Sequence, residues 1–362
     1  MGGATRVLQT QLKASTKAGH EALLISGAPA EDAGELPCPW ISHKYKSLSF
    51  LPALLWSLRK ARKSFHPEVL HIHQPLIGLL AVLIFKKDTP RVYHFHSFWR
   101  DEKLSHAKSP QARLLSHFKG WIEQTALKRM DHFIVLSDFS KKKLIHKIPS
   151  AKVEVIPGAV NSSLFSQTKS PAASIQRLND KLEMVSVRRL DPRMGLDILI
   201  EALSLYKEKH PQRPFHLSII GDGRQRIDLE KLIQKLNLNE NVTLMGRVKE
   251  NDLIESMQRA EFSILPTREL EGFGLSVIES FSAGSPVLAT SVGALPEYEK
   301  FSEVFHAVGE ANSKNLLSGL EWAHQHWKGH QLQDSCMKVV QDHFSEEVVS
   351  QKLLAFYHTL KT

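Results

Sequence analysis

Short apolar runs alternate along the chain with longer segments in which apolar residues recur every three or four positions. The short runs predict β-strands, and the longer segments predict amphipathic helices. Because the runs are apolar nearly throughout, we expect parallel sheets that are covered on both faces. The predicted strands are residues 22–26, 69–72, 92–95, 133–136 and 153–156 in the first half of the chain and residues 184–187, 217–220, 242–245, 262–265 and 287–289 in the second.

This alternation of strands and helices predicts two doubly wound, Rossmann-like α/β domains in tandem. We expect the first domain at residues 1–166 and the second at residues 174–343, separated by a polar, proline-containing linker at 167–174. Residues 344–361 have a helical pattern that no strand follows, and this last helix could pack back on the first domain. Ligands of such sheets bind at the carboxyl ends of the strands, so the expected site is a cleft between the two domains.

Composition narrows the class of protein. The 362 residues, 42% of them hydrophobic and 23% charged, are typical of a soluble globular protein. The two cysteines, Cys38 and Cys336, are too few for a disulfide scaffold or a four-cysteine zinc site and fit a reducing compartment. The longest apolar run, residues 75–85, is far shorter than the roughly 20 residues that span a membrane. Residues 1–19 contain no apolar signal-peptide core, so we expect a cytoplasmic protein.

Charge is divided unevenly between the two halves of the chain. Residues 1–170 carry 25 Lys and Arg against 12 Asp and Glu, a net charge of +13, whereas residues 171–362 carry 22 against 26, a net charge of −4. A basic first half suits an anionic partner such as a phosphate-bearing lipid, a membrane surface or a nucleic acid. A solvated basic surface explains the same charge equally well.

The most informative stretch, residues 271–296, reads EGFGLSVIESFSAGSPVLATSVGALP and follows the predicted strand at 262–265. Its first glycines, Gly272 and Gly274, allow a ligand to approach the backbone closely. A helix is expected to begin near Leu275, and its free amides and dipole would bind an anion such as a diphosphate.

Two glutamates flank that helix start. Glu279 lies about one turn into the helix, where its carboxylate can accept hydrogen bonds from the two hydroxyls of a ribose. Glu271, eight residues earlier, lies in the preceding loop, where it could hold a sugar hydroxyl. Two surface glutamates beside an amphipathic helix would give the same spacing, so the glycine-rich context carries the argument.

This stretch resembles the E-x7-E signature of the family 4 retaining glycosyltransferases, which have the GT-B fold. The resemblance extends over nearly the whole chain. The other segments that carry it are Gly2-Gly3-Ala4-Thr5-Arg6, residues 93–99 (YHFHSFW), residues 156–165 (IPGAVNSSLF), Gly221-Asp222-Gly223 and Gly246-Arg247-Val248.

The resemblance implies a transferase that moves a sugar from a nucleoside diphosphate sugar to an acceptor hydroxyl, in cell-surface glycan or glycolipid synthesis. It also implies that Arg189, in the run VRRLDPRMG, binds the donor phosphate. A guanidinium there would neutralise charge as the diphosphate leaves. The implied catalytic residues are His96 and Glu271; the implied donor-binding residues are Arg189, Arg193, Val248, Gly272, Phe273, Gly274, Leu275 and Glu279; and Gly2 and Gly3 would form an acceptor or phosphate loop.

The chain departs from the family pattern in two places. Met194 stands where the family often has lysine, and Arg188 stands where it usually has glycine. The lysine's contact with the phosphate is therefore either lost or made by Arg193 or Arg188. The family's glycine-rich loop follows a first β-strand, whereas Gly2 here follows Met1 directly. We therefore expect either a strand upstream of Met1 or a weakened first domain.

Histidines raise the question of a metal. His71 and His73 end one predicted strand and His94 and His96 end the next, so four imidazoles could gather there. The D-x-D metal motif of other glycosyltransferases is absent, and structural or acceptor-facing histidines are the simpler interpretation. We therefore expect neither a metal nor another cofactor, and the resemblance places His96 near the donor sugar and phosphate.

Other functions remain as alternatives. A glycoside hydrolase needs carboxylates on either side of the scissile bond, which a single loop–helix unit does not provide. A dinucleotide dehydrogenase is disfavoured because residues 221–224 lack the third glycine of G-x-G-x-x-G. A catalytically impaired nucleotide-sugar or polyanion-binding protein of the same fold is the remaining rival. For the enzyme we expect a nucleotide-sugar donor, an acceptor glycan or glycolipid, peripheral contact with the inner membrane surface and no nucleic acid.

Overall fold

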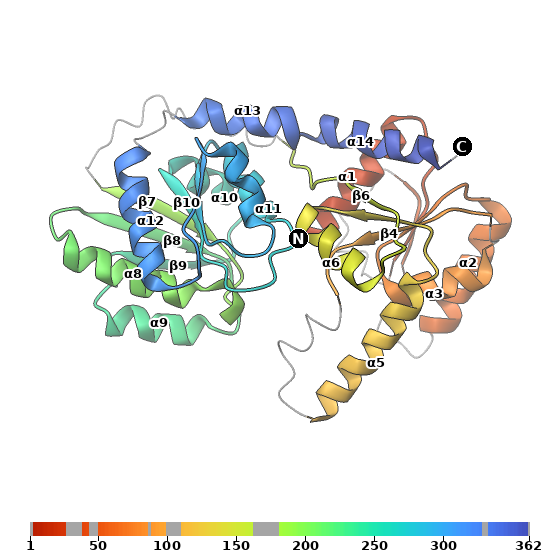
Figure 1. Cartoon of the computed structure of the whole chain (residues 1–362), viewed down its shortest axis with the longest axis horizontal. Coiled ribbons are helices and arrows are strands. Elements are labelled where there is room, and N and C mark those ends of the chain that lie inside the picture. Colours follow the sequence, from red (N-terminus) through yellow and green to blue (C-terminus); the bar gives the residue numbers. More distant parts are fainter. Residues whose placement is uncertain are drawn as a thin grey trace. The chain divides into compact units, whose positions relative to one another are not determined.

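The computed structural model describes residues 3–26, 38–42, 50–85, 88–98, 110–161, 181–327 and 332–360 (Figure 1). The chain divides into two compact units. Unit 1 comprises Met1–Gly158 together with Glu346–Thr362, and unit 2 comprises Ala159–Ser345. The expected linker at 167–174 lies outside the described residues. The last helix of the chain belongs to unit 1, although it follows unit 2 in sequence.

Unit 1 is an α/β unit with a parallel four-stranded sheet in the order β3-β4-β5-β6 and a separate parallel pair, β1-β2. All five strands predicted for this half are present, and β2 is an additional one. The elements are α1 (Gly3–Lys17), β1 (Leu24–Ser26), β2 (Trp40–Ser42), α2 (Phe50–Ser64), β3 (Leu70–Ile72), α3 (Pro75–Ile84), β4 (Arg91–Phe95), α5 (Pro110–Leu127), β5 (His132–Val135), α6 (Asp138–Lys147), β6 (Val153–Val155) and α14 (Glu346–Thr359).

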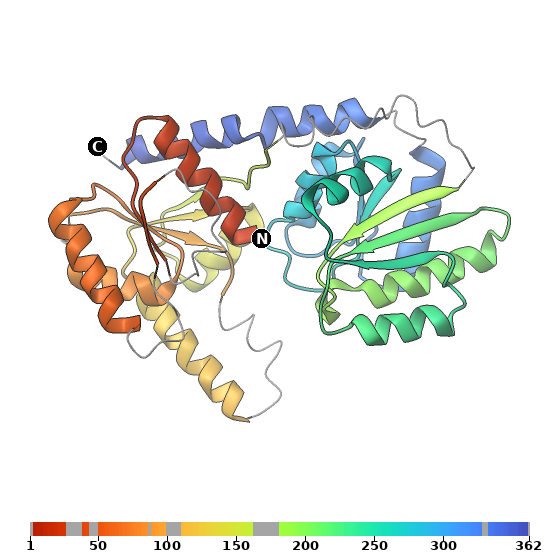
Figure 2. The ribbon, with the colours of Figure 1, turned by 180° about the vertical axis from the view of Figure 1, so that it is seen from behind.

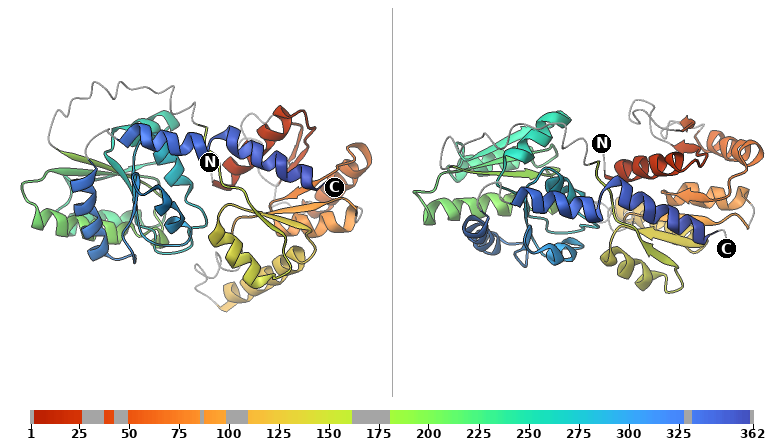
Figure 3. Two further views of the ribbon diagram at one scale, coloured as in Figure 1. Left: turned by 45° about the horizontal axis from the view of Figure 1, so that its top comes forward. Right: turned by 90° about the horizontal axis from the view of Figure 1, so that it is seen from above.

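The N-terminal part of unit 1 has no strand ahead of β1 among the described residues. Gly3, expected in a loop, is the first residue of α1, and Gly2 lies outside the described residues. Helix α1 packs against α14, and Figures 2 and 3 show the two helices next to each other. A groove of about 630 Å³ is lined by β1, β3 and one face of α1. The strands of unit 1 thus form two sheets with a groove between them.

Unit 2 contains one parallel six-stranded sheet in the order β12-β11-β10-β7-β8-β9. The five predicted strands are present, and β12 is an additional one. The elements are β7 (Leu182–Val187), η2 (Pro192–Met194), α8 (Leu196–Lys209), β8 (Phe215–Ile220), α9 (Arg226–Lys235), β9 (Val242–Gly246), α10 (Glu250–Arg259), β10 (Phe262–Leu265), α11 (Leu275–Ser282), β11 (Val287–Ala289), η3 (Leu295–Phe301), β12 (Phe305–Ala307), α12 (Ser313–His326) and α13 (Gln333–His343).

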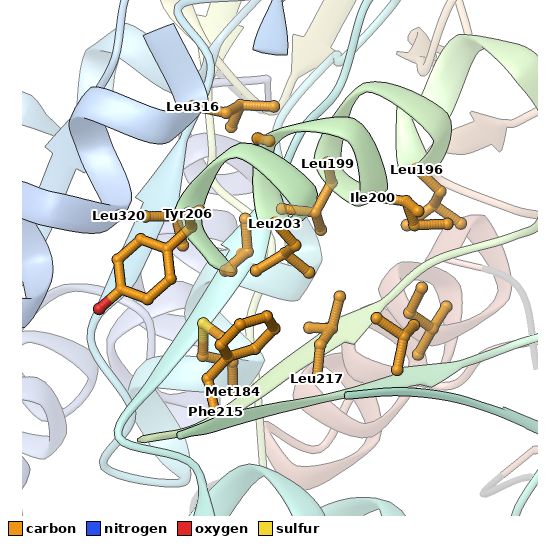
Figure 4. Packing of buried hydrophobic residues seen from close by; sticks show 14 of the residues in the cluster. Met184, Leu196, Leu199, Ile200, Leu203, Tyr206, Phe215, Leu217, Leu316 and Leu320 are labelled. Atoms are coloured by element: carbon orange, nitrogen blue, oxygen red, sulfur yellow. The ribbon is translucent and has the colours of Figure 1, made fainter. Parts of the chain in front are cut away.

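The core of unit 2 shows why its predicted helices form where they do. Apolar residues on α8 recur at three- and four-residue spacing, which gives the helix a buried stripe. Leu199 and Leu203 pack over Phe215 and Leu217 of β8, as Figure 4 shows. Leu316 and other residues of α12 extend the same cluster. This core anchors one face of the sheet from whose strands the site loops leave.

In both units, the helices pack their apolar faces on the sheets. Within the described parts of the chain, no helix has the length and apolar character needed to cross a membrane.

Candidate functional site

The candidate site lies where the strand order of unit 2 changes direction. β7 is the first strand of the sheet, and its neighbours are β8 on one side and β10 on the other. The chain winds away from β7 in both directions, and doubly wound sheets bind ligands at the carboxyl ends of the strands at such a point. The loops that leave these ends are residues 188–195 after β7 and 266–274 after β10. They contain six of the twelve site residues that the sequence indicated: Arg189, Arg193, Glu271, Gly272, Phe273 and Gly274.

The loop after β10 ends in a helix N-terminus that is built for close approach. Helix α11 begins at Leu275, as predicted, and Gly274 caps it in the left-handed conformation with φ +87°. A Cβ atom on Gly274 would lie 3.0 Å from Leu295 and 3.2 Å from Val277, so any larger residue would be strained and crowded. The free amides of the first helical turn and the helix dipole favour an anion at this end of the helix.

Glu271 is held in place through its side chain. A guanidinium nitrogen of Arg188 donates to the Glu271 carboxylate at 2.9 Å, and a second donates to the Thr267 hydroxyl at 2.8 Å. The two charged side chains are only 7% and 15% exposed. A buried charge pair of this kind fixes both side chains, because losing either partner leaves the other unpaired.

The backbone of Glu271 is also fixed. Its carbonyl accepts a hydrogen bond from the Ala294 amide at 2.9 Å. A Cβ atom on Gly293 would lie 2.1 Å from that same carbonyl oxygen, so only glycine allows the two loops to touch. The preceding residue, Leu270, has a φ of +59°, which is uncommon for a branched side chain. Strain of this kind persists only where the surrounding structure enforces it.

The arginines after β7 have different surroundings. Arg188, the departure from the family pattern, is the buried partner of Glu271, whereas Arg189, the expected phosphate ligand, is exposed. Arg193 is half-buried, and its Nε atom has no hydrogen-bond partner among the described residues. Two motif glycines support this loop: Cβ atoms on Gly221 and Gly223 would lie 1.9 Å and 2.3 Å from the carbonyl oxygens of Arg188 and Leu190.

The remaining donor-binding candidates take several roles in unit 2. Glu279 is half-buried on α11, in the turn after the capped N-terminus, and Gly272 is half-buried in the loop before it. Phe273 is buried against the rings of Tyr298 and Phe344, so its side chain packs behind the loop. Val248 is half-buried and packs against the cluster formed by β7, β8 and α10.

Tyr298 is a neighbour of this site that the sequence reasoning missed. Burial, followed by the negative charges of Glu271 and Glu297, raises the pKa of its hydroxyl well above the usual value. Its oxygen has no hydrogen-bond partner among the described residues. The signal that could have found it is the Gly-x-Leu-Pro-x-Tyr spacing after β11, which places the ring beside Gly274.

Unit 1 brings the four histidines together. β3 and β4 are neighbours, and the rings of the four histidines form five close pairs with centroid separations of 4.6 to 5.7 Å. Four of these pairs are stacked, and the pair of His94 and His96 is tilted. Burial lowers the pKa of His71 to about 3 and lowers the pKa values of His73 and His94 well below 6.5, with repulsion from neighbouring histidines adding to the effect. These three imidazoles are therefore neutral at pH 7. His96, the catalytic candidate, is half-buried just after β4.

The fold and the site define a class of protein. Two parallel-sheet α/β units, one of them carrying a glycine-capped helix N-terminus with a glutamate on each side, are the plan of the GT-B glycosyltransferases. The structure is similar to that of sucrose-phosphate synthase from Thermosynechococcus elongatus, with a TM-score of 0.78 and 21% identity. The match covers 99% of this chain and 94% of that chain. The structure is also similar to Anabaena HepE in complex with UDP, with a TM-score of 0.77, 17% identity and 96% of that chain covered.

The chain belongs to glycosyltransferase family 4. A family model described as "Glycosyltransferase Family 4" matches residues 1–164, and one described as "Glycosyl transferases group 1" matches residues 170–330. The predicted family and the predicted GT-B fold are therefore confirmed.

Several relatives have names that refer to lipids. The chain is 26% identical to alpha-monoglucosyldiacylglycerol synthase of Acholeplasma laidlawii, covering 83% of this chain and 77% of that protein. It is 27% identical to phosphatidyl-myo-inositol mannosyltransferase of Mycobacterium leprae, covering 79% of this chain and 71% of that protein. The match to the gpi3 subunit of phosphatidylinositol N-acetylglucosaminyltransferase from Schizosaccharomyces pombe is 30% identical over 46% of this chain, but it spans only 36% of that protein.

Proposed function

We propose that this chain is a retaining glycosyltransferase that moves a sugar from a nucleoside diphosphate sugar to a hydroxyl of a glycan or glycolipid acceptor, in cell-surface glycan or glycolipid synthesis. The observation that carries the proposal is the capped N-terminus of α11 with Glu271 before it and Glu279 after it. Unit 2 would hold the donor, and the basic unit 1 would hold the acceptor. The UDP complex of HepE, a protein of the same fold, supports this choice of donor.

Each donor residue has a distinct task in this reaction. The amides at the start of α11 would stabilise the charge that grows on the diphosphate as the glycosidic bond breaks. Arg189, which is exposed, and Arg193, whose Nε atom lacks a partner among the described residues, are the cations available to the same diphosphate. Glu279 would bind the ribose hydroxyls, and Glu271 would orient the donor sugar. With these groups, the negative charge of the leaving diphosphate would be neutralised without a metal.

Retention follows if the acceptor hydroxyl attacks from the face that the diphosphate leaves. Glu271, the best-placed carboxylate, is already paired with a buried arginine and so is a poor covalent nucleophile. The departing phosphate would take the proton of the acceptor hydroxyl, and the sugar carbon would exchange one C–O bond for another on the same face. The protein's part is orientation, charge stabilisation and exclusion of water.

The proposed acceptor is lipid-linked, and the basic surface of unit 1 would bind an anionic headgroup. Trp56 on α2 and Phe118 and Trp121 on α5 are each more than half exposed. Aromatic side chains near basic residues are typical of surfaces that sit at a bilayer interface. These features support peripheral attachment to a membrane, which we propose to be at its cytoplasmic face.

The test is a screen for donor hydrolysis and transfer with several nucleotide sugars, combined with calorimetry of the nucleoside diphosphate. Replacing Glu279 by alanine removes charge-assisted hydrogen bonds to the ribose and should cost about 2–3 kcal/mol of binding. Glu230→Ala on α9, an exposed glutamate of the same unit, is the control and should bind normally. Unchanged affinity in a folded Glu279→Ala protein would contradict the assignment.

The rival function is a nucleotide-sugar or polyanion-binding protein without transferase activity. The observation in favour of this rival is that the Glu271 carboxylate, which is expected to hold the donor sugar, already forms an ion pair with Arg188. Intact binding of the nucleoside diphosphate, with neither donor hydrolysis nor transfer for any sugar, would establish the rival.

A further inference from the structure

The proposed transfer reaction gives no role to His71, His73 and His94 of unit 1. His71, His73 and His94 are buried side by side, and one ring nitrogen from each lies within 4.8 Å of the other two. Each Nδ1 atom contacts another side chain. The contacts are His71 Nδ1 to the Tyr357 hydroxyl at 2.5 Å, His73 Nδ1 to His96 Nε2 at 3.2 Å and His94 Nδ1 to the Gln11 amide at 2.9 Å.

The Nε2 atoms of the same three histidines are buried and have no hydrogen-bond partner among the described residues. Three orphaned imidazole nitrogens in one place are costly, because each loses its bond to water and gains nothing in return. An ion that takes all three lone pairs would remove that cost. We propose that His71, His73 and His94 form a metal site that binds one Zn²⁺, or a similar imidazole-binding transition-metal ion, through their Nε2 atoms.

The surrounding contacts suit metal ligation. A histidine that binds a metal through Nε2 carries its proton on Nδ1 and donates it to a neighbouring acceptor. Tyr357 and His96 can accept from His71 and His73 in that way. For His94, the Gln11 side chain must turn its amide so that Oε1 faces the ring. Gln11 Oε1 is itself buried without a partner among the described residues, so the turned amide satisfies it as well.

Metal binding requires the three rings to rearrange. Zn–N bonds of about 2.0–2.1 Å in a tetrahedral site bring ligand nitrogens to roughly 3.4 Å from one another. The ligating nitrogens must therefore approach from separations of up to 4.8 Å. The rings, which stack at interplanar angles of 8–27°, must also turn until their nitrogen lone pairs converge on one point. Three histidines leave a fourth position for water. This ion lies in unit 1 and is structural, so the proposal of metal-free transfer is unaffected.

The site would join parts of the chain that are far apart in sequence. Gln11 belongs to α1 and Tyr357 to α14, and both contact histidines at the ends of β3 and β4. Binding of zinc should therefore stabilise unit 1, because a ligand that binds only the folded state raises its melting temperature.

The experiment uses full-length protein stripped with a chelator and titrated with Zn²⁺ by calorimetry and with Co²⁺ by visible absorption. We expect one ion per chain, a tetrahedral Co²⁺ spectrum and a higher melting temperature with zinc. His73→Ala should lose at least 100-fold in affinity, and His146→Ala, an exposed histidine on α6, should lose nothing. Tyr357→Phe keeps all three ligands and should weaken binding about 10-fold, so it tests the site even if His73→Ala does not fold.

Binding of less than one zinc per chain would overturn the proposal. So would equal zinc affinity in the wild-type, His73→Ala and Tyr357→Phe proteins, since the ion would then be bound elsewhere. Neither measurement involves a sugar donor, and the result is independent of the proposed transferase activity.

Discussion

The buried ion pair between Arg188 and Glu271 offers the sharpest test of the site. Arg188→Met keeps most of the side-chain volume but leaves the Glu271 carboxylate, only 15% exposed, without its cation. The Thr267 hydroxyl loses its donor at the same time. Because the uncompensated charge cannot reach water without moving the loop, the variant should be strongly destabilised.

The expected loss follows from the burial of the pair. Breaking a buried ion pair costs about 3–5 kcal/mol, which is a large part of the stability of one domain. For a unit of this size, that loss lowers the melting temperature of unit 2 by about 6–20 °C. Calorimetric melting or urea unfolding measures this loss of stability. Arg188→Met combined with Glu271→Gln removes the stranded charge and should recover about half of the loss or more.

A matched pair in the same unit provides the control. Arg226 and Glu230 on α9 are also 2.9 Å apart, but their side chains are 39% and 50% exposed. Arg226→Met should therefore cost less than about 1 kcal/mol. If Arg188→Met destabilises unit 2 no more than Arg226→Met does, the buried pair does not persist in solution, and the fixed position of Glu271 is refuted.

Three further predictions concern other parts of the chain. Gly293→Ala should weaken nucleoside diphosphate binding at least 10-fold, because its Cβ atom displaces the Glu271 carbonyl and with it the loop that leads to the N-terminus of α11. Gly309→Ala, with a similar positive φ but 3.6 Å of clearance, should bind normally. Burial and repulsion from His326 lower the pKa of His306, so its contribution to stability is complete above about pH 6.5 and is lost as the pH falls. His326→Gln should raise that pKa in an NMR titration, and an unchanged value would exclude the repulsion. Trp121→Ser should reduce sedimentation of the protein with anionic lipid vesicles several-fold. The control is Ile227→Ser, at an equally exposed apolar residue of unit 2, and it should leave sedimentation unchanged. Equal reduction in both variants would remove the support for a membrane-facing α5.

The strands that the sequence predicted are those with strong apolar runs. The two that it missed, Trp40–Ser42 and Phe305–Ala307, are three residues long and contain a polar residue. The predicted strands β1, β3 and β6 share both properties, so shortness alone does not explain the misses. Pairing with a neighbouring strand creates such short strands, and periodicity within the segment does not reveal it. The start of α11 at Leu275 was predictable because glycine and the helical pattern are local signals.

The contacts of the site were harder to predict. Arg188 and Glu271 are 83 residues apart, and no local pattern pairs them. Their meeting depends on β7 and β10 being neighbours, which is a property of the sheet order. The roles of Gly221 and Gly223 depend in the same way on how closely two loops approach, so the sequence marked the glycines without showing the backbone that requires them. The phosphate role of Arg189 stays a prediction.

The division of unit 1 into two sheets determines which of its strands can separate by local unfolding. β1 is paired with β2 and β3 with β4, and both β1 and β3 line the same groove. A strand that is paired on one side has fewer hydrogen bonds to break than a strand within a continuous sheet, so the β1–β2 pair can separate without opening β3–β6. Backbone amides of residues 24–26 should then exchange with deuterium much faster than those of β4 and β5. Once separated, β1 and β2 would expose unpaired backbone groups to which a second unfolding molecule could add, strand to strand, and begin to aggregate.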